Sequence, residues 1–227
     1  ISQLTFVPRA GYQGTVVLPF TGTNSNNSTF LGEVIITVQP TSSSSYFSDM
    51  ASYSGGAKAA VDFLLENGIT SGISASQFGP EGSIRRGDFA LMMYQAFGLA
   101  GSASSGSYFN DVSPSDYYGK AVNTLYSMGI VTGRGSGRYD PSGTLSRQDA
   151  MLMVQKAMRA VGWSASDGPY SYLTGYHDAG QVASYAQGAM AYVIQMGILP
   201  TDSGRLAPND PLTRVDMAQV LHRALTY

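Results

Sequence analysis

Three arginines at matching positions are the side chains in this sequence best suited to hold an anion. Arg86, Arg147 and Arg214 lie 61 and 67 residues apart, each at the start of an expected helix. A planar guanidinium matches a carboxylate through two parallel hydrogen bonds, but the positive end of a helix dipole disfavours a cation. Each arginine therefore needs a nearby negative charge. That charge is either an aspartate of the protein, in a structural ion pair, or an anionic ligand.

Two sets of aspartates recur in step with the arginines. The first set follows an aromatic residue by two positions and comprises Asp49, Asp111 and Asp178. These carboxylates could accept hydrogen bonds from sugar hydroxyls, or they could cap helices and stabilise turns. The second set lies two residues after each arginine and comprises Asp88, Asp149 and Asp216. Negative charge in a first helical turn stabilises a helix by roughly 0.3–1 kcal/mol, so we interpret the second set as structural.

These side chains are positioned by a unit that occurs three times, most completely in residues 129–161. Gly129 favours the left-handed conformation that ends a helix, and a glycine-rich loop follows. Residues 140–143 (Asp-Pro-Ser-Gly) predict a turn, and Ser146 is expected to cap a second helix, with Asp149 three residues later. Residues 68–97 and 197–225 repeat this order. Such self-similarity indicates tandem structural repeats.

Each unit also begins with an amphipathic helix. In the first unit the apolar face comprises positions 57, 60, 61, 64 and 65, and in the third it comprises positions 186, 189, 190, 193 and 194. This is the spacing of one helical face, and the second unit follows it more loosely. A single two-helix unit cannot bury its apolar stripe, so we expect the three units to pack on one another.

The first 40 residues have a different character. Residues 4–7, 15–19 and 30–38 favour short β-strands, and alternation is clearest in the last of these. Because three short strands bury little surface alone, we expect residues 1–40 to be the C-terminal part of a β-sandwich module. Residues 41–45 are rich in serine and indicate a linker.

The composition excludes several classes of protein. The 227 residues carry a net charge of −2, with 12% charged residues, so we expect no nucleic-acid partner. Cysteine is absent, which rules out disulfides and thiolate metal sites. No apolar run is long enough to predict a membrane span. The sequence also shows no recurring nucleophile and base, and we expect no enzyme activity, catalytic residue, metal site or cofactor.

The repeated motifs resemble the S-layer homology (SLH) family over about four-fifths of the chain. In the second unit the matching segments are Phe109-Asn110-Asp111, Gly129-Ile130-Val131-Thr132-Gly133, Tyr139-Asp140-Pro141 and Leu145-Ser146-Arg147-Gln148-Asp149. The resemblance places one repeat in residues 46–100, a second in 108–162 and a third in 175–227. It implies a mainly α fold, in which three tandem two-helix repeats pack as a three-lobed pseudo-trimer behind a short N-terminal β segment.

The resemblance also implies a function and a location. SLH triplets anchor exported proteins to the bacterial cell envelope, in the cell wall or S-layer, by binding secondary cell-wall polysaccharide that often carries pyruvylated N-acetylmannosamine. The pyruvate ketal is a carboxylate, which suits the arginines, and helix N-terminal amides also favour an anion. The alternative is a protein–protein assembly module that contacts other surface-layer proteins without binding glycan. The candidate ligand-binding residues are Arg147, Arg86, Arg214, Asp111, Asp49, Asp178, Gly133, Gly72 and Arg85.

Departures from the family pattern rank these candidates. Tyr117 and Tyr185 replace a helix-start tryptophan in the second and third repeats, whereas the first repeat has only glycines at that place. Arg85 replaces the capping residue of the first repeat and adds a cation beside Arg86. Thr201 replaces the loop glycine of the third repeat, which is expected to alter its groove. The second repeat fits best, so the sequence favours Arg147 as the first residue to test.

Overall fold

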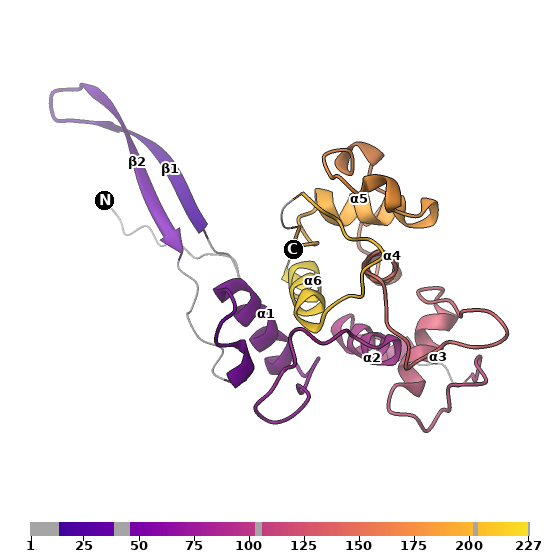
Figure 1. Cartoon of the computed structure of the whole chain (residues 1–227). Coiled ribbons are helices and arrows are strands. Elements are labelled where there is room, and N and C mark those ends of the chain that lie inside the picture. The colour runs from indigo at the N-terminus through magenta and orange to yellow at the C-terminus, as the bar shows by residue number, and fades with distance from the viewer. Residues whose placement is uncertain (1–13, 39–45, 103–105, 202–203, 227) are drawn as a thin grey trace.

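The computed structural model describes residues 14–38, 46–102, 106–201 and 204–226, and these form a β-hairpin and a mainly helical body (Figure 1). The strands are β1 (Gly14–Thr23) and β2 (Thr29–Val38). The α-helices are α1 (Gly55–Glu66), α2 (Arg86–Ala96), α3 (Gly119–Ser127), α4 (Arg147–Ala160), α5 (Gln187–Gln195) and α6 (Arg214–Thr226). Short 3-10 helices span Ser48–Met50, Leu99–Ser102, Tyr170–Tyr172, Ala179–Gln181 and Ser184–Ala186. The predicted combination of helical repeats with an N-terminal β segment is confirmed.

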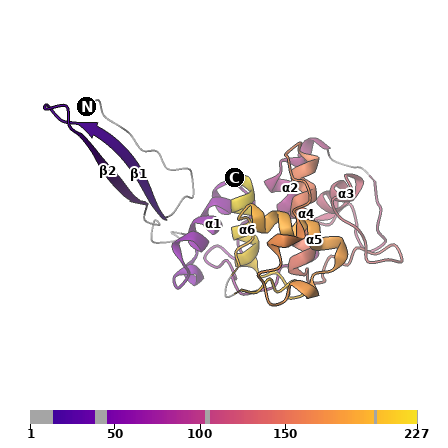
Figure 2. The same cartoon turned by 90° about the horizontal axis from the view of Figure 1, so that it is seen from above.

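The hairpin is antiparallel and projects away from the helices in both views (Figures 1 and 2). Val17 pairs with Ile35, and the side chain of Asn24 closes the turn by accepting from the amides of Asn26 and Ser28. Pro19 lies inside β1, where a two-stranded sheet leaves the outer edge open, as the lack of its amide hydrogen requires. The strand expected over residues 4–7 and the linker over 41–45 lie outside the described residues.

The helices pair between repeats. The second helix of each repeat packs on the first helix of the next, so α2 contacts α3 and α4 contacts α5. The series closes because α6, at the end of the chain, packs on α1. Figures 1 and 2 both show α1 and α6 side by side. The repeats therefore pack on one another, as expected, and they do so in a closed ring.

The centre of the ring is a buried crossing of three short segments, one from each repeat. Ile84, Leu145 and Leu212 lie two residues before the three motif arginines, and each is at most 1% exposed. The amide of Ile84 donates to the carbonyl of Leu212 at 2.9 Å, and the amide of Leu212 donates to that of Leu145 at 2.8 Å. Backbone pairing thus fixes where each following helix begins.

Several local predictions are confirmed. Gly129 has a positive φ of 70° at the end of α3, and Ser146 caps α4 by accepting from the amide of Asp149 at 3.3 Å. Arg85 stands at the N-cap of α2 without a side-chain capping bond. Five methionines of the second helices pack in the core and are at most 5% exposed; they are Met92, Met93, Met151, Met153 and Met217.

Candidate ligand-binding grooves

The three motif arginines connect neighbouring repeats in a cycle. Arg86 of the first repeat donates from Nε to the carbonyl of Tyr139 in the second repeat, at 2.9 Å. Arg147 donates in the same way to Leu206 of the third repeat at 3.1 Å. Arg214 of the third repeat completes the cycle by donating to Phe78 of the first repeat at 2.8 Å. Each guanidinium is therefore held at a boundary between repeats.

The start of each second helix explains why its arginine points into the neighbouring repeat. The amide of Arg86 donates to the carbonyl of Gly143, and the amide of Gly87 donates to that of Pro141, both at 2.9 Å. Equivalent bonds begin α4 and α6. The first two amides of these helices are thus occupied by the neighbouring turn. They do not offer the anion site expected from the helix N-terminus, and the guanidinium is left as the main donor there.

Two of the arginines also lie over aromatic rings. The guanidinium carbon of Arg86 is 4.5 Å from the ring centroid of Tyr139, and that of Arg214 is 4.8 Å from the centroid of Phe78. These distances are those of cation–π contacts, which offset part of the cost of desolvating a cation. Burial still lowers the pKa of Arg214 below its ordinary value, because water is excluded from the charged group.

Arg147 differs from the other two because it has a carboxylate partner. Its Nη1 lies 2.6 Å from Oδ2 of Asp216, and its Nη2 donates to the carbonyl of Pro200 at 3.2 Å. All three of its guanidinium nitrogens are therefore engaged. Among the described residues, no carboxylate oxygen lies within 4.0 Å of the guanidinium of Arg86 or Arg214.

Two grooves open at the positions of the unpaired arginines. Groove 1, of about 480 Å³, is lined by residues 68–73, Asp88, Leu91, Met92, Gln95, Tyr117 and Arg214. Groove 2, of about 430 Å³, is lined by residues 130–134, Arg86, Asp149, Leu152, Met153, Lys156 and Tyr185. The two linings correspond nearly position for position. Each combines one repeat's loop and second helix with a tyrosine from the next repeat and an arginine from the preceding repeat in the ring.

The comparisons with known proteins agree with this repeat architecture. A family model for the S-layer homology domain matches residues 46–90, 108–151 and 175–218, which together make up more than half of the chain. The chain belongs to the S-layer homology domain family. SLH domains generally anchor surface proteins to the cell wall, and this assignment places the chain at the extracellular cell surface.

Similar proteins carry SLH regions in different contexts. The chain is 27% identical over 192 residues to the Surface-layer 125 kDa protein of Lysinibacillus sphaericus, covering 83% of this chain and 16% of that protein. It is 30% identical over 175 residues to an endoglucanase of Bacillus sp. strain KSM-635, covering 71% and 17%. It is 26% identical over 171 residues to Exoglucanase XynX of Acetivibrio thermocellus, covering 74% and 15%. The chain thus spans less than a fifth of each of these relatives.

The described part of this SLH triplet contains no cluster of three histidine, aspartate or glutamate side chains arranged to hold a metal ion. None of its helices is long and apolar enough to cross a membrane.

A tyrosine holds the helix-start aspartate in each SLH groove. Tyr117 donates to Asp88 in groove 1, and Tyr185 donates to Asp149 at 2.7 Å in groove 2. Burial, followed by the hydrogen bond and charge of the aspartate, raises the pKa of both tyrosines to about 12. The aspartates are thus tied to tyrosines and do not pair with the groove arginines. This function adds to the helix-start role that the sequence predicted for them.

The first repeat also has this tyrosine, which the sequence analysis missed. Tyr53 directly precedes the N-cap of α1, as Tyr117 and Tyr185 directly precede the N-caps of α3 and α5. The expectation that the first repeat has only glycines at this place is therefore wrong. Tyr53 donates to Glu81 of its own repeat. Asp216, which corresponds to the aspartates that the other two tyrosines bind, is bound by Arg147 instead.

The early aspartates hold turns within their own repeats. Both carboxylate oxygens of Asp49 accept from the successive amides of Phe78 and Gly79, at 2.9 and 2.7 Å. Asp111 and Asp178 bind the equivalent turns with distances of 2.8 to 2.9 Å. Burial alone would raise the pKa of Asp111 and Asp178, but these amide bonds outweigh it and lower both values. A further contact of these oxygens with a sugar stays a prediction.

Of the remaining candidates, Gly133 and Gly72 line grooves, whereas Arg85 does not. A Cβ on Gly133 would lie 2.6 Å from the carbonyl oxygen of Arg138, and one on Gly72 would lie 2.5 Å from the ring of Phe47. Other atoms of the protein thus lie too close to these two positions for a side chain to fit. Both glycines line grooves, but no ligand is needed to explain why they are glycines. Arg85 is exposed, and its charge opposes the rise in the pKa of Tyr117, which lines groove 1.

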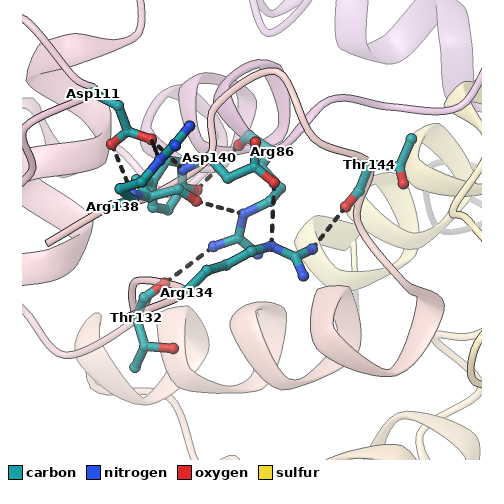
Figure 3. Close-up of polar contacts among 8 residues, drawn as sticks. Arg86, Asp111, Thr132, Arg134, Arg138, Asp140 and Thr144 are labelled. Carbon is teal, nitrogen blue, oxygen red and sulfur yellow. Dashed lines mark hydrogen bonds and ion pairs between the residues drawn. The ribbon is translucent and has the colours of Figure 1, made fainter. Parts of the chain in front are cut away.

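Groove 2 contains two cations that the sequence analysis did not single out. Nε of Arg134 lies 3.5 Å from Oδ2 of Asp140, and Nη2 donates to the carbonyl of Thr144 at 3.2 Å (Figure 3). Lys156 reaches the same groove from α4. The register of the repeats could have identified Arg134, because it places this residue directly after the loop glycine Gly133.

Proposed function

We propose that this SLH triplet anchors an exported protein to the cell envelope by binding an anionic secondary cell-wall polysaccharide in grooves 1 and 2. One observation carries the proposal. Arg86 is 6% exposed and Arg214 is partly buried, yet neither guanidinium has a carboxylate of the protein within 4.0 Å. A buried charge is costly unless it is paired, and an anionic ligand would supply the missing partner.

The chemistry of the two sites fits a carboxylate on a sugar. Backbone carbonyls and an aromatic ring hold each guanidinium in place and compensate part of its charge. Neither Nη of Arg214, nor Nη1 of Arg86, has a hydrogen-bond partner among the described residues. A pyruvate ketal on an amino sugar presents a planar carboxylate, which such donors bind well. The apolar and tyrosine walls suit the body of a saccharide.

The boundary between the second and third repeats, which we call the third boundary, is expected to be structural and not a binding groove. Arg147 there donates to Asp216 and to the carbonyls of Leu206 and Pro200. This geometry changes the order of tests suggested by the sequence, and we place Arg214 and Arg86 before Arg147. The proposal gives the chain no catalytic role, so any enzyme activity of the whole protein would belong to other domains.

The test is binding of the chain to purified cell-wall polysaccharide, before and after mild acid removes its pyruvate ketals. Arg214→Gln and Arg86→Gln should each abolish one groove, and the double variant should lose retention. Arg159→Gln is the matched control, because Arg159 pairs with Asp167 and lines neither groove. Unchanged retention of the double variant, or full binding to ketal-free polymer, would contradict the proposal.

The alternative function is protein–protein assembly without glycan. Binding to cell walls from which the polysaccharide has been stripped distinguishes the two functions. Glycan anchoring predicts that retention is lost with the polysaccharide, whereas an assembly module would be retained by the surface proteins that remain.

A further inference from the structure

We infer that groove 2 recognises a saccharide bearing two negative groups, whereas groove 1 takes a saccharide bearing one, and that Arg134 and Lys156 determine this difference. The inference rests on the proposed function and adds a specificity to each groove. It follows from comparing the two linings at equivalent positions.

The pseudo-symmetric repeats allow the comparison to be made residue by residue. Arg86 and Asp149 of groove 2 correspond to Arg214 and Asp88 of groove 1, so this part of the lining is shared. The difference in charge lies at two other positions. Arg134 of groove 2 corresponds to Ile73, and Lys156 corresponds to Gln95. Groove 2 is therefore lined by three cations and one carboxylate, against one cation and one carboxylate in groove 1.

Arg134 is held where its charge acts on the groove. Its guanidinium contacts Asp140 and the carbonyl of Thr144 (Figure 3). Its side chain remains 49% exposed. The charges of Arg134 and Arg86 both act to lower the pKa of Tyr139, against the burial that raises it to about 12. Arg134 also acts on Tyr185 at the opposite wall. Its positive charge is therefore felt across groove 2, although Asp140 balances part of it.

The three cations of groove 2 differ in exposure to solvent, and this difference determines which of them each anionic group would contact. Arg86 is buried, whereas Arg134 is half exposed and Lys156 is partly exposed. One negative group can pair with Arg86, and a second one on the same or the next sugar can then reach Arg134 or Lys156. In groove 1 the equivalent side chains are an isoleucine and a neutral amide. Arg85 acts on Tyr117 there, but it is exposed and outside the lining, so a second charge inside groove 1 would be desolvated without gaining a cation of the lining.

Exchanging these residues between the grooves tests the inference. The probes are two synthetic disaccharides, one with a single pyruvate ketal and one with a ketal and a glucuronate carboxylate. In an Arg214→Gln background, which leaves groove 2, calorimetry should show about tenfold tighter binding of the doubly charged probe, the size of one charge-assisted contact. Arg134→Ile with Lys156→Gln should remove that preference. Ile73→Arg with Gln95→Lys should create it in groove 1, measured in an Arg86→Gln background.

Two controls separate recognition from support of the loop. Lys120→Gln removes an exposed lysine that lines neither groove, and it should leave the ratio of the two affinities unchanged. Asp140→Asn keeps a side chain that tolerates the positive φ of 62° at this position. It should strengthen binding of the doubly charged probe, because Arg134 loses its competing carboxylate. A purely structural Arg134 would give no such gain.

The outcomes distinguish the inference from the proposed function. If the wild-type chain binds neither disaccharide, the proposed glycan anchoring fails, and the inference fails with it. If both probes bind groove 2 equally well, or if the preference survives Arg134→Ile with Lys156→Gln, the inference alone is overturned. A preference that moves with the exchanged residues supports it.

Discussion

Arg147 and Asp216 form an ion pair across the boundary between the second and third SLH repeats, with 2.6 Å between Nη1 and Oδ2. The equivalent partners at the other two boundaries do not meet, because Tyr117 and Tyr185 hold the aspartates there. The same repeated set of an arginine, an aspartate and a tyrosine therefore makes different contacts at different boundaries. It forms an ion pair between the second and third repeats and leaves a guanidinium available in a groove at the other two boundaries.

Replacing Arg147 should therefore reduce stability more than ligand binding. Arg147→Gln leaves Asp216 without its cation and removes bonds to two carbonyls, so the free energy of unfolding should fall by about 2–4 kcal/mol. Urea denaturation measures this change. Arg159→Gln breaks an ion pair between largely exposed side chains, and it should cost no more than about 1 kcal/mol.

The same variant checks the assignment of the third boundary. Folded Arg147→Gln protein, assayed well below its unfolding temperature, should be retained on cell-wall polysaccharide as strongly as the wild type. A selective loss of retention in the folded variant would mean that the third boundary also binds glycan.

Local signals in the sequence predicted the repeated elements well. The left-handed Gly129, the cap at Ser146 and the recurrence of the three arginines depend only on neighbouring residues and on register. The sequence could not show that Arg147 has a carboxylate partner while Arg86 has none. That difference depends on groups more than 40 residues away, brought together only when the repeats pack into the ring.

The tyrosines show why spacing alone was insufficient. Tyr53 follows its early aspartate by four residues, whereas Tyr117 follows Asp111 by six. The segment between the turn and the first helix therefore varies in length, although its end is fixed by the helix N-cap. A motif counted from the aspartate misses Tyr53, and one counted back from the helix would have found it.

The turn held by Asp178 should make stability depend on pH in the acidic range. Because the amide bonds lower the pKa of Asp178 below its ordinary value of 3.8, the unfolded chain binds a proton more readily than the native chain. The stabilisation is present above pH 3.8 and is lost as the pH falls through the native pKa. Asp178→Asn should lose about 1–3 kcal/mol at pH 7, since one of the two amides loses its acceptor.

The comparison with the wild type makes that prediction specific. Chemical denaturation at pH 7 and at pH 3 should show the difference in unfolding free energy between Asp178→Asn and wild type shrinking as the carboxylate is protonated. A difference that stayed constant over this range would show that the charge of Asp178 does not contribute.

Gly133 should be needed for steric reasons alone. A Cβ there would come within 2.6 Å of the carbonyl oxygen of Arg138 and 2.8 Å of the ring of Phe109. Gly133→Ala should therefore lower the free energy of unfolding by about 1–3 kcal/mol and distort the wall of groove 2. Gly175→Ala is the matched control, since no atom lies within 4 Å of its added Cβ. Equal unfolding free energies for the two variants would contradict the predicted clash.

The interface that closes the ring should be sensitive to mild acid through His222 of α6. Its ring packs 4.9 Å from that of Phe63 in α1, and the residue is 9% exposed. Burial, followed by the charge of Arg223, lowers the pKa of His222 below 6.5. The unfolded chain therefore takes up the proton first, and the free energy of unfolding should fall as the pH drops below about 6.5 towards the native pKa.

The variant His222→Phe tests this dependence, because it keeps an aromatic ring against Phe63 and removes the titrating group. Thermal unfolding at pH 7.5 and 5.5 should show a smaller loss of stability for this variant than for the wild type, whereas His177→Gln, at an exposed position, should behave like the wild type. An equal loss in all three proteins would place the acid sensitivity outside the contact between α1 and α6.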